Sequence, residues 1–410
     1  MEFLTILFLI YIFLGLYVFF FLIILTLKNK EEMLSYPEPN KSYAISIIVP
    51  AYNEEKSIED TIKHVAAFDY PKDKFEIIAI NDGSTDNTLK VLKKLSKNIK
   101  NLKIIDKKNS GKADSLNEGV RQAKGELVAV VDSDSFPSKE SLMKLTGYFD
   151  NPEMGAVTSF VSIRNKDESF LTRIQSLEYF ILGWNRKIMH LIDAMDVTNG
   201  PLSLYRKKYV IEVGGFDKNT LTEDIDLTWN ILSHGHKTAM CLSASVTTIA
   251  PKNFKAWLRQ RVRWGIGGLQ AISKYKKDFL KKGMFGIFVI PYVSLGIIMG
   301  LFSILLSTYI VGKNLLLWLM TSNYLVSNNL PMFQTQDINL IPSTIFYFFI
   351  ILFALSLFYF GYILTRLKYD KIFTLKKFFN ALFYAIIYLT LYPAIWFYAI
   401  YRYIIKDYRW

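Results

Sequence analysis

The chain has 410 residues, of which 51% are hydrophobic and 15% aromatic, and its mean hydropathy of +0.21 is high for a soluble protein. Its formal net charge is +13, but no zinc-ligand spacing, basic–aromatic repeat or helix-turn-helix pattern accompanies that charge, which argues against a nucleic-acid partner. The single cysteine, Cys241, offers neither an internal disulfide nor a cysteine metal cluster. These properties predict a membrane protein.

The hydrophobic residues gather in four segments, each long enough to cross the hydrocarbon layer of a bilayer, namely residues 3–27, 285–311, 340–364 and 381–405. The first segment follows Glu2 and lacks both a basic start and a small-residue cleavage site, so it is expected to be an uncleaved anchor rather than a signal peptide. Lysine and arginine clusters flank the segments, and these clusters are expected to face the cytoplasm.

Four simple crossings would leave the C-terminus outside, although Lys406 and Arg409 favour the cytoplasmic side. Two alternatives would remove this conflict. In the first, residues 381–405 are bent near Pro393 and do not cross the membrane in a simple way. In the second, residues 315–326 form an extra crossing or a re-entrant segment. Four spans are the working expectation.

Strands and helices are expected to alternate between the first two apolar segments. The expected strands cover residues 44–49, 75–80, 102–105 and 127–131, and helices follow them with starts near Ser57, Thr85 or Asp86, and Asn109. This alternation predicts a mostly parallel, Rossmann-like sheet covered by helices. The P-loop and dinucleotide-binding glycine signatures are absent, which argues against a kinase, an ATPase or a dehydrogenase.

Acidic and amide side chains follow three of the expected strands: Asn53 and Glu54, then Asp82, then Asp132 and Asp134. Each one alone is an ordinary turn residue, but turns explain their repetition less well. Ligands of alternating β/α domains bind beyond the carboxyl ends of the parallel strands, so these side chains are expected to share one crevice. Carboxylates there can hold Mg²⁺ or Mn²⁺ together with substrate phosphates.

Six motifs occur in the order and approximate spacing of processive family 2 glycosyltransferases, which the chain resembles: Pro50-Ala51-Tyr52-Asn53-Glu54, Asn81-Asp82-Gly83-Ser84-Thr85-Asp86, Gly111-Lys112-Ala113, Asp132-Ser133-Asp134, Thr222-Glu223-Asp224 and Gln260-Arg261-Val262-Arg263-Trp264. The resemblance is to membrane enzymes such as poly-N-acetylglucosamine, hyaluronan, chitin and cellulose synthases. It implies an α/β GT-A domain in the cytosol, joined to interfacial and transmembrane helices. It also implies a nucleoside-diphosphate sugar as donor and Mg²⁺ or Mn²⁺ as cofactor.

The resemblance implies donor-side roles for residues from several of these motifs. Asp134 would hold the metal, and Asp132 would face the nucleotide. Arg263 and the metal would neutralise the charge that develops on the leaving diphosphate. The other donor-binding residues would be Tyr52, Glu54, Asp82 and Lys112.

On the acceptor side, Asp224 is expected to be the catalytic base, because the attacking hydroxyl must lose its proton to a group within hydrogen-bond reach. Thr222 would cap the helix that begins there. Glu223, Gln260 and Trp264 would contact the acceptor, with the indole face of Trp264 against a sugar. A base without a separate nucleophile implies a single displacement, so an α-linked donor would give a β-linked product.

These expectations divide the chain into an N-terminal transmembrane anchor (residues 1–28), a cytosolic glycosyltransferase domain (29–253), interfacial amphipathic helices with the Gln-x-x-Arg-Trp motif (254–283) and a C-terminal transmembrane region of about three spans (284–410). Residues 176–179 and 199–206 also look family-like and are expected to line the acceptor site. The expected location is the plasma membrane, with the catalytic domain in the cytoplasm.

The favoured hypothesis is a UDP-sugar-dependent, metal-dependent hexosyltransferase that polymerises N-acetylglucosamine into a β-linked polysaccharide and translocates it. Three apolar segments after the Gln-x-x-Arg-Trp motif favour a polymer, because a channel needs several helices. The alternative is transfer of a single sugar to a lipid carrier or membrane lipid. A third hypothesis is a non-enzymatic carbohydrate-binding or transport subunit. Membrane lipid and a small membrane accessory subunit are conceivable partners beside the donor and the acceptor.

Overall fold

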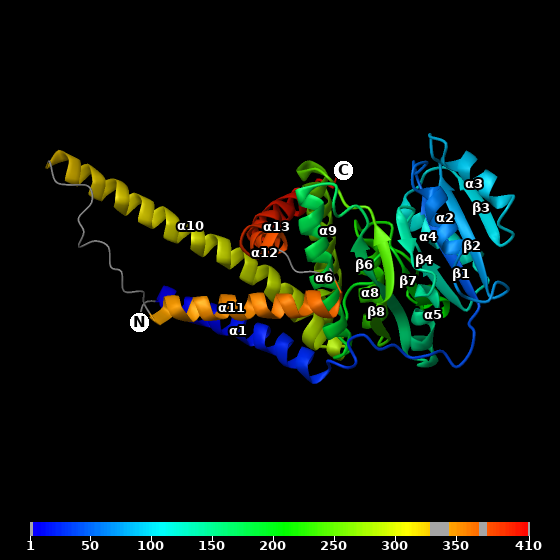
Figure 1. Ribbon diagram of the computed structural model, residues 1–410, viewed down its shortest axis with the longest axis horizontal. Coiled ribbons are helices and arrows are strands. Elements are labelled where there is room, and N and C mark those ends of the chain that lie inside the picture. Colours follow the sequence, from blue (N-terminus) through cyan, green and yellow to red (C-terminus); the bar gives the residue numbers. More distant parts are fainter. Residues whose placement is uncertain (1–2, 329–343, 369–374, 409–410) are drawn as a thin grey trace. The chain divides into compact units, whose positions relative to one another are not determined.

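The computed structural model describes residues 3–328, 344–368 and 375–408 (Figure 1). The chain forms two compact units, Met1–Ser294 together with Tyr398–Trp410, and Leu295–Phe397. The first unit contains the sheet and the helices that cover it, whereas the second consists of apolar helices.

The first unit is built on an eight-stranded sheet with the order β3-β2-β1-β4-β7-β6-β8-β5. Neighbours among β1 to β4 are parallel, and β6 and β8 are parallel to each other. Strand β7 is antiparallel to both of its neighbours, β4 and β6, and β5 is antiparallel to β8. The predicted mostly parallel, helix-covered sheet is therefore confirmed. The strands are β1 (Ile45–Ala51), β2 (Phe75–Asp82), β3 (Leu102–Lys107), β4 (Leu127–Val130), β5 (Ser135–Pro137), β6 (Met154–Ile163), β7 (Ser203–Arg206) and β8 (Lys237–Thr248).

The helices follow the strands in alternation through the first half of the sheet. The helices are α1 (Phe3–Lys28), α2 (Ile58–Ala66), α3 (Thr88–Ser96), α4 (Lys112–Gln122), α5 (Ser141–Thr146), α6 (Phe170–His190), α7 (Lys207–Glu212), α8 (Glu223–Ser233), α9 (Phe254–Tyr275), α10 (Ile290–Ser327), α11 (Thr344–Arg366), α12 (Leu375–Phe383) and α13 (Leu389–Ile404).

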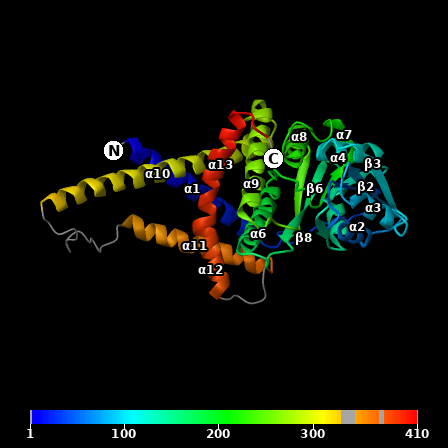
Figure 2. The same cartoon turned by 90° about the horizontal axis from the view of Figure 1, so that it is seen from above.

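Strand β1 shows why the apolar runs become central strands. Every residue of β1 is buried, and alternate side chains point to opposite faces of the sheet. Ile45, Ile47 and Val49 pack with residues of α2, α3 and α5, whereas Ile48 packs with Ile78 and with residues of α4, α7 and α8. Figure 2 shows α2 on one side of the sheet and α7 and α8 on the other. A continuous apolar run is what a strand needs when helices cover both of its faces.

Three helices in the described residues are long and apolar enough to cross a membrane: Ile6–Lys28, Phe285–Ser327 and Phe378–Ile404. They overlap the first, second and fourth expected segments. The third expected segment begins outside the described residues, and its described part contains a shorter apolar helix, Ile350–Arg366.

Residues 315–326 do not form a separate segment, because they continue the helix that begins before them. Phe285–Ser327 has 43 residues, which at 1.5 Å per residue span about 64 Å, roughly twice the hydrocarbon thickness. No proline or glycine lies between Gly312 and the end of this helix at Ser327, so nothing breaks the helix there. Pro393 lies inside α13, and Arg409 lies outside the described residues.

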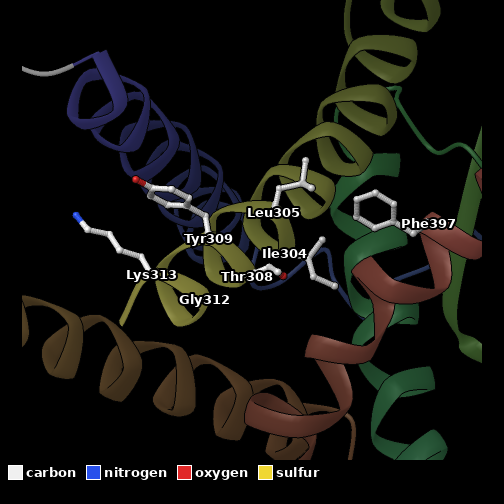
Figure 3. Close-up of a pocket in the computed structure, with 7 residues that line it drawn as sticks. All are labelled: Ile304, Leu305, Thr308, Tyr309, Gly312, Lys313 and Phe397. Carbon is white, nitrogen blue, oxygen red and sulfur yellow. The ribbon is translucent and has the colours of Figure 1, made fainter. Parts of the chain in front are cut away.

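The second unit contains a cavity of about 570 Å³ beside α10 (Figure 3). Among the described residues that line it, none carries a carboxylate that could act as a base or a metal ligand. Its chemistry is that of an apolar helix surface with a few polar groups, whereas the carboxylates of the sequence motifs line a cavity in the first unit. The residues that line the cavity beside α10 are Ile304, Leu305, Thr308, Tyr309, Gly312, Lys313 and Phe397.

Candidate active site

A cavity of about 270 Å³ opens in the first unit beyond the carboxyl end of β4. Its walls come from the start of α4, the segment after β4, α6, the segments that precede β7 and α8, and α9. It brings together the expected site residues Lys112, Asp132, Asp134, Glu223, Asp224, Gln260, Arg263 and Trp264. Residues of motifs that are more than a hundred positions apart in the sequence therefore share one cavity.

Lys112 connects the two acidic parts of this cavity. Its Nζ atom lies 2.7 Å from Asp132 Oδ1 and 2.8 Å from Glu223 Oε1. Burial alone would lower the pKa of Lys112, but the carboxylates of Asp132, Glu223 and Asp224 raise it well above its usual value. The lysine therefore carries a permanent positive charge between the Asp-Ser-Asp and Thr-Glu-Asp motifs.

Gly200 allows the wall of the cavity to approach Asp132 closely. A Cβ atom at position 200 would lie only 2.5 Å from Asp132 Oδ2. Gly200 belongs to the family-like segment 199–206, which was expected to line the site, and Asn199 and Pro201 do line the cavity beside it.

Asp134 lies where negative charge is in excess. Burial, followed by repulsion from Asp132 and from Glu54, raises the pKa of Asp134 to about 6. A divalent cation would relieve this repulsion, so the carboxylates of Asp132 and Asp134 fit such an ion. Within the described part of the chain, no three His, Cys, Asp or Glu side chains form a complete metal cage. That agrees with ions whose remaining ligands are water and substrate phosphates.

Asp224 lies in the first turn of α8 and lines the cavity. Its Oδ1 atom accepts a hydrogen bond of 2.9 Å from the Ile225 N–H. Burial and the neighbouring Glu223 raise the pKa of Asp224 to about 6, against the opposing effects of Lys112 and Arg263. A carboxylate whose pKa is raised in this way is a stronger base than a carboxylate in water, which suits it to accept a proton.

The expected side-chain cap of α8 is not formed. Thr222 occupies the N-cap position, but its hydroxyl accepts no hydrogen bond from the helix. The Thr222 hydroxyl instead faces Gly267 of α9, where a Cβ atom would collide with it. Close packing of α8 against α9 has displaced the local capping interaction.

Gln260, Arg263 and Trp264 line the cavity from α9. Arg261, to which the sequence analysis assigned no role, contacts Gln260 and Trp264. Arg261 Nη1 donates to Gln260 Oε1 at 2.6 Å, and its guanidinium lies 4.1 Å from the centre of the Trp264 ring. One face of the indole is thus covered by a cation, which leaves the other for a ligand. The presence of Arg261 inside the motif was the signal that could have identified it.

Arg261 is itself fixed by a buried ion pair. Its Nη2 atom lies 2.5 Å from Glu178 Oε2 on α6, and the two side chains are only 1% and 3% exposed. Glu178 was noted within the family-like segment 176–179, but it holds Arg261 rather than lining the cavity. The ion pair links α6 to α9.

Arg186 of α6 also lines the cavity, beside the cations Lys112 and Arg263, and sequence reasoning missed it. Its Nη1 atom donates to Asn199 Oδ1 at 3.1 Å. Burial lowers the pKa of Arg186, while Asp196 and Asp224 oppose this effect. No motif surrounds Arg186 in the sequence, so only the packing of α6 reveals it.

Three expected donor-binding residues do not line the cavity. Tyr52 is half exposed beyond β1, and Glu54 accepts a hydrogen bond of 2.5 Å from the Ser57 hydroxyl. Asp82 is buried and accepts hydrogen bonds from the backbone N–H groups of Ser110 and Gly111, at 3.0 and 2.9 Å, and from a lysine of β3. Asp82 thereby holds the turn that delivers Lys112.

Comparison with known proteins finds relatives of this chain by sequence and by fold. The family described as "Glycosyltransferase like family 2" matches residues 40–267. The poly-β-1,6-N-acetyl-D-glucosamine synthase of Staphylococcus aureus (strain COL) is 31% identical over 264 residues, which are 64% of this chain and 63% of that protein. The synthase of the same name from Staphylococcus epidermidis is 30% identical over 291 residues, which are 70% of each chain.

A mannosyltransferase from Pyrobaculum calidifontis, solved in complex with GDP-mannose and Mn²⁺, superimposes with a TM-score of 0.58 at 18% identity and covers 97% of this chain and 99% of that one. This likeness shows a shared fold. The match to the S. aureus synthase spans 63% of that relative's length. The matched domain and the similarity to the S. epidermidis synthase together show that the chain belongs to glycosyltransferase family 2.

Proposed function

We propose that this protein is a membrane-embedded, inverting glycosyltransferase that transfers N-acetylglucosamine from a UDP-sugar to the end of a growing β-linked polysaccharide. The observation that carries the proposal is the shared cavity, in which the acidic pair Asp132 and Asp134, the candidate base Asp224, and Arg263 with Trp264 line one space. The names of the staphylococcal relatives support the choice of sugar and of a polymeric product.

The donor half of the site would be the region of Asp134, Asp132, Lys112 and Arg263. Asp134, with Asp132 beside it, would hold Mg²⁺ or Mn²⁺, which neutralises charge on a diphosphate when it is bound. Lys112 is positively charged, and Arg263 makes no ion pair of 4 Å or less within the described residues, so its guanidinium is available to an incoming anion. Both cations would stabilise the leaving diphosphate as its charge develops.

The acceptor half would centre on Asp224. Its carboxylate takes the proton of the acceptor hydroxyl while that oxygen bonds to the anomeric carbon and the bond from that carbon to the diphosphate breaks. Because the acceptor oxygen attacks the anomeric carbon directly, one displacement occurs and the configuration inverts.

Trp264 would support the acceptor sugar. Arg261 covers one face of its ring, so the remaining face can stack on a sugar. Gln260 Oε1 is occupied by Arg261, which leaves the amide N–H groups of Gln260 to donate to sugar oxygens. This platform is apolar and fixed, which suits a site that must release and regrip a chain end.

We further propose that residues 29–253 face the cytoplasm of a plasma membrane, with residues 254–283 at the membrane surface and residues 284–410 embedded in it. The apolar helices Ile6–Lys28 and Phe285–Ser327 border the catalytic part of the sequence on both sides, which supports this division. Exposed lysines precede Phe285, as expected of a cytoplasmic flank.

The test uses the full chain in detergent with Mg²⁺ or Mn²⁺ and, in turn, UDP-N-acetylglucosamine, UDP-glucose, UDP-glucuronic acid and GDP-mannose. Nucleotide release and product size are both measured. We expect UDP release from UDP-N-acetylglucosamine together with a polymer. A single-sugar glycolipid as the only product would show that the enzyme transfers one sugar to a lipid and does not polymerise. Absence of release from every donor with either metal would refute an enzymatic role.

A further inference from the structure

One face of α9 continues beyond the cavity. Arg263, Gly267, Gln270 and Lys274 recur every three or four residues and therefore lie along the same side of this helix. Arg263 lines the cavity, but Gln270 and Lys274 do not. The C-terminal half of the face instead contacts the segment that leads into α8.

Gln270 holds the backbone of that segment. Its Oε1 atom accepts a hydrogen bond of 2.9 Å from the Leu221 N–H and one of 3.3 Å from the Thr220 hydroxyl. One turn earlier, Gly267 packs so closely on Thr222 that no side chain fits between them. The residues shortly before Asp224 are thus fixed to α9 by two hydrogen bonds and by direct packing.

Lys274 binds one carboxylate in the segment before α8 and another in the first turn of α8. Its Nζ atom donates to Asp217 Oδ2 at 2.7 Å and to Asp226 Oδ2 at 2.9 Å. The Asp226 side chain is only 2% exposed and follows Asp224 by two positions in the first turn of α8. Asp224 therefore lies between the two carboxylates that Lys274 binds.

We propose that Gln270 and Lys274 are positioning residues for Asp224. They fix the start of α8 to the helix that carries Arg263 and Trp264, so that the base and the donor-binding cation keep one relative position. The proposal rests on the proposed function. Misplacement of a reacting group by about 1 Å can cost roughly 10²-fold in rate, which is why contacts remote from the reacting atoms matter here.

The test compares Lys274→Met, Lys274→Arg and Gln270→Leu with the wild-type chain. Transfer at saturating donor, the dissociation constant of UDP and the thermal midpoint are measured for each. Ser273→Ala is the matched control, because Ser273 is an exposed neighbour on α9 that lines the same small surface cavity as Gln270 and Lys274. Gln270→Leu removes the hydrogen bonds without disturbing the ion pairs, so it decides the matter if Lys274→Met fails to fold.

We expect kcat to fall by about 10- to 100-fold in Lys274→Met and Gln270→Leu, with UDP affinity retained. Lys274→Arg should recover most of the rate, and Ser273→Ala should match the wild type. A wild-type kcat in both disruptive variants would overturn the proposal. So would an equal loss of UDP affinity and kcat, since that would mean a general structural role. If the wild type itself transfers no sugar, the proposed function falls and this proposal falls with it.

Discussion

Substitution of Gly200 by alanine should disable the site through a single added methyl group. The new Cβ atom would lie 2.5 Å from Asp132 Oδ2, whereas ordinary van der Waals contact begins at 3.4 Å, so the carboxylate or the opposing backbone must move by about 0.9 Å. Asp132 is paired with Lys112 at 2.7 Å, and a shift of that size away from the lysine would lengthen this distance to about 3.6 Å, beyond hydrogen-bonding range. A displacement near 1 Å corresponds to a fall of roughly 10²-fold in turnover.

The assay measures kcat with UDP-N-acetylglucosamine, UDP affinity and the thermal midpoint for Gly200→Ala. Gly296→Ala in α10 is the control, because a Cβ atom there meets nothing within 4 Å and alanine favours a helix. We expect a large loss of turnover with a near-normal melting temperature, since the cavity of about 270 Å³ gives the displaced groups room. Wild-type kcat and affinity in Gly200→Ala would show that close contact with Asp132 is unimportant and would refute the reasoning.

Three further predictions concern the metal, the base and the acceptor platform. Asp134→Asn, like a chelator, should abolish most transfer because a neutral amide binds a hard cation more weakly, and full activity in excess chelator would contradict this. The value of kcat/KM should fall as the pH drops below about 6, because protonation of Asp224 removes the base. A value of kcat/KM that stays constant from pH 5 to 8 would contradict this. Trp264→Ala should shorten the polymer more than it slows hydrolysis of the donor, because the stacking face is lost while the donor-binding groups remain. Polymer of unchanged length would show that Trp264 is only a membrane-surface anchor.

The first half of the sheet was predictable because its signals are local. Each of β1 to β3 is an apolar run followed by polar turn residues and then a helix, and β4 repeats the apolar run and the polar turn, so pattern and structure coincide. β5 has three residues and β7 has four, and neither belongs to the alternation of strands and helices that identified the equally short β4. β6 and β8 pair although dozens of residues separate them, and no local pattern encodes that pairing.

The same distinction explains which site residues were found. Asp132, Asp134, Asp224 and the Gln-x-x-Arg-Trp residues lie in short motifs, and the cavity gathers them. Arg186 owes its place to the packing of α6, which the sequence around it does not reveal. Asp82 is an expected donor-binding residue, and the structure shows in addition that its carboxylate accepts hydrogen bonds from the backbone N–H groups of Ser110 and Gly111. Such partners depend on the folded loop and cannot be read from spacing.

The most direct test of the central claim is a comparison of donor binding and sugar transfer in Asp224→Asn. The amide preserves the shape of the carboxylate and removes its ability to take a proton. The account predicts UDP-sugar affinity close to that of the wild type, with transfer reduced by roughly 10²- to 10⁴-fold. Transfer at the wild-type rate, or loss of nucleotide binding together with transfer, would contradict the claim that this cavity binds the donor and uses Asp224 as its base.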